Sequence, residues 1–155
     1  MEQQAAEKIL AFDFGTKSIG VAIGNKTFFT VEPENAIHAA DGIPEQGRLT
    51  DLFNKWQPDL VVVGLPLNAD GSWQEVTFRA RKFARRLSSA FHIRCEMKDE
   101  RYSTKQARDE LFNDGGYRAL EKGKIDSLSA VIILNGWFES GGIPLELCQP
   151  EKQHV

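Results

Sequence analysis

The sequence has few cysteines and no long hydrophobic run. Its 155 residues include only two cysteines, Cys95 and Cys148, which stand far apart. This number and spacing exclude a disulfide framework and a cysteine-based zinc site. The three histidines, His38, His92 and His154, also lack the spacing of a metal-binding motif. No apolar run approaches the roughly 20 residues of a membrane-spanning helix, so we expect no membrane contact.

The chain also lacks an excess of positive charge. It carries 19 Lys and Arg against 22 Asp and Glu, which gives a net charge of −3 and a pI near 5.6. Proteins that coat nucleic acid are usually basic, so this balance argues against that class. It is compatible with an enzyme that has a local basic patch and an acidic metal site. The start, MEQQAAEK, lacks the basic and apolar regions of a secretion signal, and we expect a cytoplasmic protein.

The composition is that of a folded domain. Hydrophobic residues make up 41% of the chain, with ten Phe and three Trp, which is enough for a substantial core. The length is close to the commonest domain size of about 100–150 residues. We therefore expect one domain over residues 1–140, followed by a loose C-terminal tail over 141–155.

Hydrophobic periodicity predicts an α/β chain. Three strands, over 8–14, 18–24 and 27–32, form an antiparallel meander that ends at Pro33. Helices and strands then alternate, which predicts parallel strands joined by right-handed crossovers. The further elements are a helix ending before Pro58, a strand in LVVVGLP (60–66), a helix over 73–91, a strand in HIRCEMKDE (92–100), a helix over 104–112, a mobile loop over 113–124 and a helix in IDSLSAVIILNGWFE (125–139). The predicted fold is a mixed central sheet flanked by helices.

Acidic residues stand at positions where such a sheet gathers functional groups. Asp13 lies within the apolar run ILAFDFG, where an unpartnered carboxylate costs several kcal/mol. Asp99 and Glu100 end the last predicted strand, and Asp126 begins the final helix. Sites in open α/β sheets form beyond the carboxyl ends of the parallel strands, so these acids should converge. Alternation along the strand does not decide between Asp99 and Glu100, because parity often breaks at a strand end.

Convergent carboxylates predict a site for hard cations. Acids this close repel one another unless positive charge lies between them. Oxygen ligands favour Mg²⁺ or Mn²⁺, and two such ions about 4 Å apart activate water and stabilise the leaving oxygen of a phosphodiester. Structural roles also remain open: Asp126 as a helix cap, and Asp99 and Glu100 as solvated surface charges. Asp13 has only a weak structural explanation.

Four motifs carry a resemblance to a known family. FDFGTKSIGVAIG, VVVGLPLNADG, DER at 99–101 and KGKIDSLSAVIIL, in this order, resemble the YqgF/RuvX family over about residues 8–139. The resemblance implies a ribonuclease H-like fold and a nuclease that matures the 5′ end of pre-16S ribosomal RNA. The family has also been described as resolving Holliday junctions.

The resemblance also assigns residues to the site. By position, the three family acids fall on Asp13, Glu100 and Asp126, as catalytic residues and ligands of Mg²⁺ or Mn²⁺. This favours Glu100 over Asp99. The chain departs from the family pattern at one point. Many members have a Ser-Asp pair after the GVA motif, whereas this chain has Ile23-Gly24-Asn25 there.

Basic residues near the acids are candidates for phosphate contacts. Lys17 lies in the turn after Asp13. Arg101 adjoins Glu100, and its role is either to neutralise a phosphate or to pair with an acid. The long helix carries several more cations, whose alternative role is a solvated face with stems packed on the core. The candidates are Lys17, Arg79, Arg81, Arg101, Arg118 and Lys124. Trp73 and Tyr117 are aromatic residues that either stack on unpaired bases or pack structurally.

Other functions remain open at this level. An actin-like ATPase begins with a similar phosphate turn but needs a second domain. A non-catalytic RNA- or ribosome-binding factor would use the basic surfaces and leave the acids idle. A resolvase of branched DNA would use the same metal site, since that site contacts only phosphate. We favour a nuclease for precursor rRNA, a monomer or weak homodimer that acts on nucleic acid and ribosomal particles.

Overall fold

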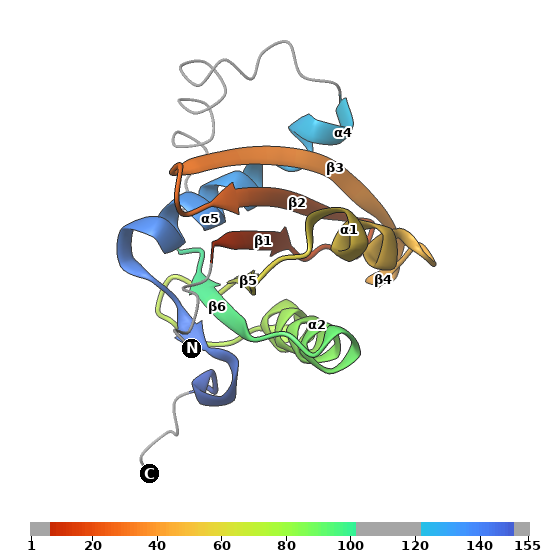
Figure 1. Ribbon diagram of the computed structural model, residues 1–155. Helices are drawn as coiled ribbons and strands as arrows, with labels where there is room; N and C mark the ends of the chain where they lie inside the picture. Colours follow the sequence, from red (N-terminus) through yellow and green to blue (C-terminus); the bar gives the residue numbers. More distant parts are fainter. Residues whose placement is uncertain (1–6, 102–121, 151–155) are drawn as a thin grey trace.

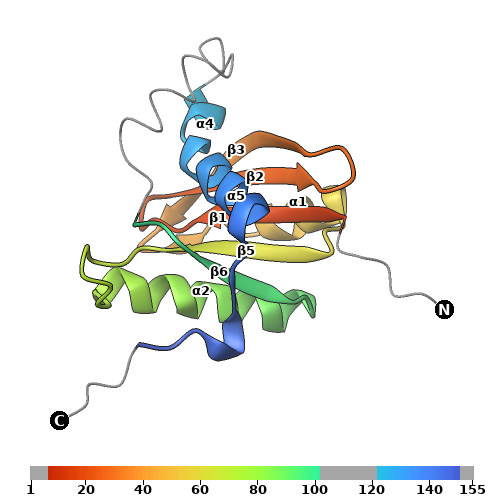
Figure 2. The same ribbon diagram turned by 90° about the vertical axis from the view of Figure 1, so that its left-hand side faces the viewer.

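The computed structural model describes residues 7–101 and 122–150 (Figure 1). A seven-stranded mixed sheet forms its centre, in the order β4-β3-β2-β1-β5-β6-β7. Helices cover both faces, with α2 on one side and α5 on the other (Figure 2). This architecture confirms the predicted fold class. No helix among the described residues is long and apolar enough to cross a membrane.

The first three strands form the predicted antiparallel meander. They are β1 (Lys8–Asp13), β2 (Ser18–Asn25) and β3 (Thr30–Ala40). The expected end of β3 at Pro33 is wrong, because the strand continues for seven more residues. Pro33 pairs with Ala22 on its inner side, and β4 (Ile43–Pro44) pairs with β3 only at Ala39 and Ala40. Pro33 therefore lies on an edge of the described sheet, where its missing N–H breaks no ladder.

The parallel half of the sheet follows the prediction closely. The elements are α1 (Arg48–Trp56), β5 (Leu60–Leu65), α2 (Glu75–Phe91) and β6 (Cys95–Asp99). β5 is parallel to both β1 and β6, and all six of its residues are buried. Full burial explains its continuous β-branched sequence, because both faces of a central parallel strand are covered.

Alternation along the strands divides the core into two layers. Leu10, Phe12 and Val63 face α1 and α2, whereas Ile9 and Val62 face α5. Residues 9, 11 and 13 of β1 therefore share the α5 face. The same alternation determines which acids meet at the end of the sheet.

The C-terminal part differs from the expected loose tail. After α4 (Lys122–Ile125) and α5 (Leu128–Ser140), the chain forms β7 (Ile143–Pro144) and the 3₁₀ helix η2 (Leu145–Leu147). β7 pairs with β6, and Cys148 is buried in the α2 layer. Residues 143–148 thus complete the sheet and its core. The predicted loop over 113–124 is helical at its end, where α4 begins. The predicted helix over 104–112, Arg118 and Tyr117 lie outside the described residues.

Candidate functional site

Strand register places Asp13 and Glu100 on the same face of the sheet. Phe12 stands beside Val63, so Asp13 comes next to Gly64. Gly64 in turn pairs with Lys98, two residues before Glu100. The Glu100 N–H donates to the Leu65 carbonyl at 3.1 Å, which continues the β5–β6 ladder past the strand end. The alternation of side chains between the two faces therefore continues to residue 100. Glu100, rather than Asp99, faces the α5 side together with Asp13.

Gly64 provides the space that the Glu100 carboxylate occupies. A Cβ atom at residue 64 would lie 2.6 Å from Glu100 Cδ and 2.7 Å from Oε2. The carboxylate thus lies directly on the backbone of β5. Asp13 and Glu100 are both half-buried. The glycine in VVVGLP is therefore part of the site, although it carries no functional group.

Gly20 and Ser127 bring Asp126 to the same end of the sheet. Gly20 pairs with Asp13 across β1 and β2. A Cβ atom on Gly20 would lie 3.1 Å from the Asp126 carbonyl oxygen and 3.4 Å from Asp13 Cβ. Ser127 is fully buried, and its Oγ accepts a hydrogen bond from the Val21 N–H at 2.9 Å. Asp126 lies in the turn before α5 rather than in its first turn, and it is exposed.

The acids suit a hard cation in chemistry but do not form a closed ligand set. Three carboxylates on one face of a sheet are donors of the type that Mg²⁺ and Mn²⁺ prefer. Yet the part of the chain that the structure describes contains no group of three acidic, His or Cys side chains close enough to hold a metal ion. Asp13 and Glu100 share a face and a strand end, and the backbone of Asp126 lies beside Asp13 across Gly20.

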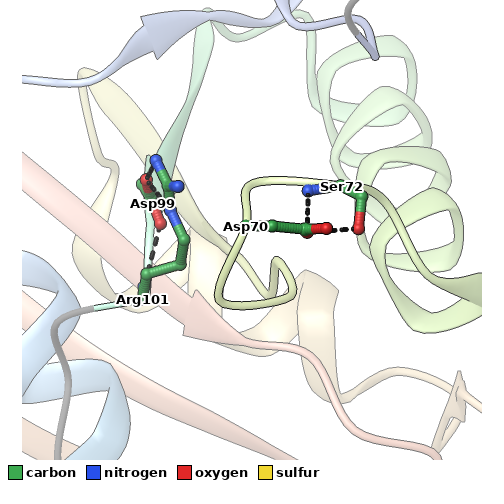
Figure 3. Close-up of polar contacts among 4 residues, drawn as sticks. All are labelled: Asp70, Ser72, Asp99 and Arg101. Carbon is green, nitrogen blue, oxygen red and sulfur yellow. Dashed lines mark hydrogen bonds and ion pairs between the residues drawn. The ribbon is translucent and has the colours of Figure 1, made fainter.

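Asp99 has a different task on the other face. Its carboxylate accepts hydrogen bonds from the backbone N–H of Arg101 at 2.9 Å and from Nε at 2.8 Å, and Arg101 Nη2 lies 2.7 Å away (Figure 3). Burial raises the pKa of Asp99, but the hydrogen bonds and charge of Arg101 outweigh it, so this pKa lies below its usual value. Asp99 is therefore an ionised partner that orients Arg101.

The loop after β5 borders the same guanidinium. A Cβ atom on Gly71 would lie 3.0 Å from Arg101 Nη1. Within this loop, the Asp70 carboxylate accepts hydrogen bonds from the hydroxyl and the backbone N–H of Ser72 (Figure 3). The hydroxyl bond is the main cause of the lowered pKa of Asp70. The Arg101 guanidinium is thus confined between Asp99 and the loop at Gly71.

The other residues predicted to contact phosphate lie on three different elements of the fold. Lys17 is exposed in the turn after Asp13, and its carbonyl accepts a hydrogen bond from the Ala39 N–H at 2.9 Å. Lys124 is half-buried in α4, two residues before Asp126. Arg79 and Arg81 belong to α2 and so lie in the layer on the opposite side of the sheet.

Those two arginines have distinct surroundings. Arg79 Nη2 donates to the Asp41 carbonyl at 2.6 Å and to its Oδ1 at 3.1 Å. The Arg81 Nε is buried and has no hydrogen-bond partner among the described residues. Trp73, expected to stack or to pack, packs on Phe78 with 4.9 Å between ring centroids. Two of the predicted basic residues, Lys17 and Arg101, are therefore adjacent in sequence or space to the first two acids.

Sequence reasoning missed Gly20, Gly64 and Ser127. Glycine inside an apolar strand weakens it, and often marks a position where another backbone or ligand approaches closely. Gly20 and Gly64 both carry this signal. Ser127 follows Asp126 directly and has no comparable signal, because its bond to Val21 spans 106 residues.

The comparisons with known proteins agree on family and fold. A family model described as "RuvX: Holliday junction resolvase" matches residues 7–140. Relatives from Histophilus somni (strain 2336) and Escherichia coli O157:H7 are each 56% identical over 133 residues, which cover 86% of this chain and 94% and 96% of theirs. Both are named "Putative pre-16S rRNA nuclease".

Solved structures resemble the chain in fold. RuvC of T. thermophilus, in complex with a Holliday junction substrate, has a TM-score of 0.57 at 10% identity and covers 89% of this chain and 99% of its own. The Holliday junction resolvase of fowlpox virus has a TM-score of 0.50 at 14% identity, covering 86% and 98%. At these identities the likeness shows the fold alone, which is ribonuclease H-like.

Proposed function

The chain belongs to the RuvX family, and on that premise we propose that it is a metal-dependent endonuclease that trims the 5′ end of pre-16S ribosomal RNA. The observation that carries the proposal is the placement of Asp13, Glu100 and Asp126 at one end and one face of the sheet. Gly64 separates the Glu100 carboxylate from the β1 neighbour Asp13, and Gly20 lies between Asp13 and the Asp126 backbone.

Each acid has a proposed role in hydrolysis. Asp13 and Asp126 hold the divalent cations, and Glu100 completes the site or orients the attacking water. Mg²⁺ or Mn²⁺, when bound, supplies charge that activates water and stabilises the leaving oxygen. Because Glu100 rests on the Gly64 backbone, its carboxylate has little freedom to turn away from Asp13.

Basic residues are proposed to bind the substrate backbone. Arg101 follows Glu100 in the chain and is oriented by Asp99, so its guanidinium suits a phosphate of the substrate near this strand end. Lys17 suits a neighbouring phosphate because it is exposed on the turn after Asp13. Arg79, Arg81, Arg118 and Lys124 remain proposed contacts for more distant phosphates.

The substrate is proposed from the relatives. The relatives that are 56% identical are named for pre-16S rRNA, so we favour this RNA as the substrate. We propose that the protein acts as a monomer or weak homodimer and binds the RNA on ribosomal particles in the cytoplasm. The family model is described for Holliday junctions, which makes branched DNA the second candidate. The site itself contacts only phosphate and does not distinguish the two.

A paired cleavage assay tests the proposal. Purified protein and its Asp13→Asn variant are incubated with a precursor 16S fragment and with a four-way DNA junction, each with Mg²⁺, with Mn²⁺ or with a chelator. We expect metal-dependent cleavage of the RNA by the wild type only. Cleavage of the junction but not the RNA would favour the second candidate. Equal cleavage by Asp13→Asn would overturn the site.

A further inference from the structure

An apolar groove lies along α2, on the sheet face opposite the acids. It has a volume of about 380 Å³ and runs between α2, α1 and the turn that joins β3 to β4. This volume falls within the range of small-ligand pockets, roughly 300–1,000 Å³. Apolar side chains dominate its lining: Phe14, Ile43, Leu49, Phe83, Leu87 and Phe91. Ile43 is 63% exposed, so part of this lining is open to a ligand.

One wall of the groove is positively charged. Arg79, Lys82 and Arg86 line it at spacings of three and four residues, which places them on one side of the helix. Arg79 is paired with Asp41, the only acid among the described residues that line the groove. Lys82 and Arg86 are exposed, and neither forms an ion pair within the described ranges. The groove therefore presents an excess of positive charge along an apolar floor.

The groove begins where the acidic site ends. Phe14, which lines the groove, directly follows Asp13, and its ring centroid lies 5.8 Å from Arg79 Cζ. The intervening turn is held to the next strand pair, since the Gly42 N–H donates to the Thr16 carbonyl at 2.8 Å. Lys17 is exposed on this turn. A polyanion that leaves the acids can thus cross the turn at Lys17 and enter the groove.

We propose that this groove binds a single-stranded stretch of the nucleic-acid substrate, next to the bond that is cut. The proposal rests on the nuclease function proposed above. Phosphates contact Lys82 and Arg86, and unpaired bases lay their apolar faces on the floor. A duplex is excluded because stacking within it covers the base faces that the floor would bind. The enzyme then recognises substrates in which single-stranded RNA flanks the cleavage point.

Binding of a labelled oligouridylate tests the proposal. Fluorescence anisotropy is measured with the full chain carrying Asp13→Asn, so that no cleavage occurs. Arg86→Gln is compared with Arg85→Gln, a neighbouring exposed arginine that does not line the groove. We expect Arg86→Gln to weaken binding by roughly tenfold and to lower the salt slope of log K by about 0.7, as for one lost phosphate contact on a single strand. Arg85→Gln should change neither quantity.

An apolar variant tests the floor separately. Ile43→Ser should weaken binding of oligouridylate without changing the salt slope, because it removes apolar contact and no charge. None of these variants should alter binding of a blunt RNA duplex of the same length. Equal effects of the two arginine variants, or none, would overturn the proposal. Weakened binding of polyglutamate with oligouridylate unaffected would identify a protein-docking groove instead, and would also overturn it.

The outcome is separable from that of the proposed function. If the wild type fails to cleave RNA but Arg86→Gln weakens oligouridylate binding selectively, the nuclease function is wrong and the groove is still a single-strand site. If the wild type cleaves precursor RNA and the Arg86→Gln variant binds oligouridylate normally, the groove proposal alone is wrong.

Discussion

At the scale of single residues, the site depends on two missing side chains as much as on three carboxylates. Asp13 ends a buried strand, and Glu100 lies on the strand beside it, with Gly64 between them. Strand alternation left Asp99 and Glu100 as alternatives, because parity at a strand end is unreliable, and only the family resemblance favoured Glu100. The hydrogen bond from the Glu100 N–H to the Leu65 carbonyl extends the ladder and puts Glu100 on the same face as Asp13.

Substituting Gly64 by alanine should impair catalysis more than stability. The new Cβ would lie 2.6 Å from Glu100 Cδ and 2.6 Å from Ile133 Cδ1, both ends of side chains that can shift. We expect a destabilisation of about 1–3 kcal/mol from overpacking, together with a large loss of kcat, because Glu100 is displaced. Denaturant unfolding and cleavage kinetics measure the two effects.

Gly24→Ala is the matched control for that substitution. Its Cβ would lie 2.7 Å from Leu134 Cδ2, so it crowds α5 to a similar degree, but at the other end of β2. It should destabilise the protein and leave kcat unchanged. Equal losses of kcat in the two variants would show that crowding against α5, rather than displacement of Glu100, causes the effect.

The Asp99–Arg101 pair predicts a specific pH dependence of stability. The pKa of Asp99 is lowered in the folded state, so its ionised form stabilises the protein above the ordinary Asp pKa of 3.8, and this contribution is lost as pH falls through the lower folded value. Asp99→Asn should therefore have a lower Tm than the wild type at neutral pH. The difference in Tm should shrink as the pH falls below 3.8. A constant difference would contradict the assigned ion pair.

At the scale of elements, α5 is held in place by its first residues. The Ser127 hydroxyl accepts a hydrogen bond from the Val21 N–H, and Gly20 allows the Asp126 backbone to approach Asp13. The sequence predicted α5 and its end at Gly141-Gly142 from local signals. It did not predict that β3 passes Pro33 or that residues 143–148 pack on the sheet. Both depend on which strand edge is open, a property of the assembled sheet.

Removing the Ser127 hydroxyl should loosen Asp126. Ser127→Ala leaves the buried Val21 N–H without its acceptor, which costs about 1–3 kcal/mol. We also expect cleavage to need a higher Mn²⁺ concentration for half-maximal rate, because Asp126 is less fixed relative to Asp13. Ser129→Ala, on the same helix and half-buried, is the control that should leave the metal requirement unchanged. An unchanged requirement in Ser127→Ala would show that Asp126 needs no such positioning.

At the scale of the whole molecule, the two faces of one sheet carry two tasks. The α5 face holds the acids, and the α2 face holds the basic groove, with the turn after Asp13 between them. Hydrophobic periodicity predicted the sheet and most of the helices, and the family resemblance predicted the identity of the acids. It did not predict the groove, because its walls come from α1, α2 and a turn that are separated along the chain.

The C-terminal segment should behave as part of the core. Burial raises the pKa of Cys148 and raises that of Cys95 to about 12, so neither thiol ionises appreciably at neutral pH. Both should resist alkylation by iodoacetamide in the native protein. Leu145→Asp, which places a charge where Leu145 packs against the core cluster that contains Cys148, should release the segment and make Cys148 reactive while Cys95 stays protected. Rapid alkylation of native Cys148 would contradict this packing.

The most direct test compares two adjacent acids that the sheet places on opposite faces. Glu100→Gln and Asp99→Asn are assayed for cleavage of a precursor 16S fragment at saturating Mn²⁺, with unfolding measured in parallel. Glu100→Gln should lose activity by at least about a hundredfold, as for loss of a catalytic carboxylate. Asp99→Asn, which frees one side of Arg101, should lose less than about tenfold, because Asp99 is on the opposite face from the acids and only orients Arg101. The reverse order, with Asp99→Asn inactive and Glu100→Gln active, would contradict the site.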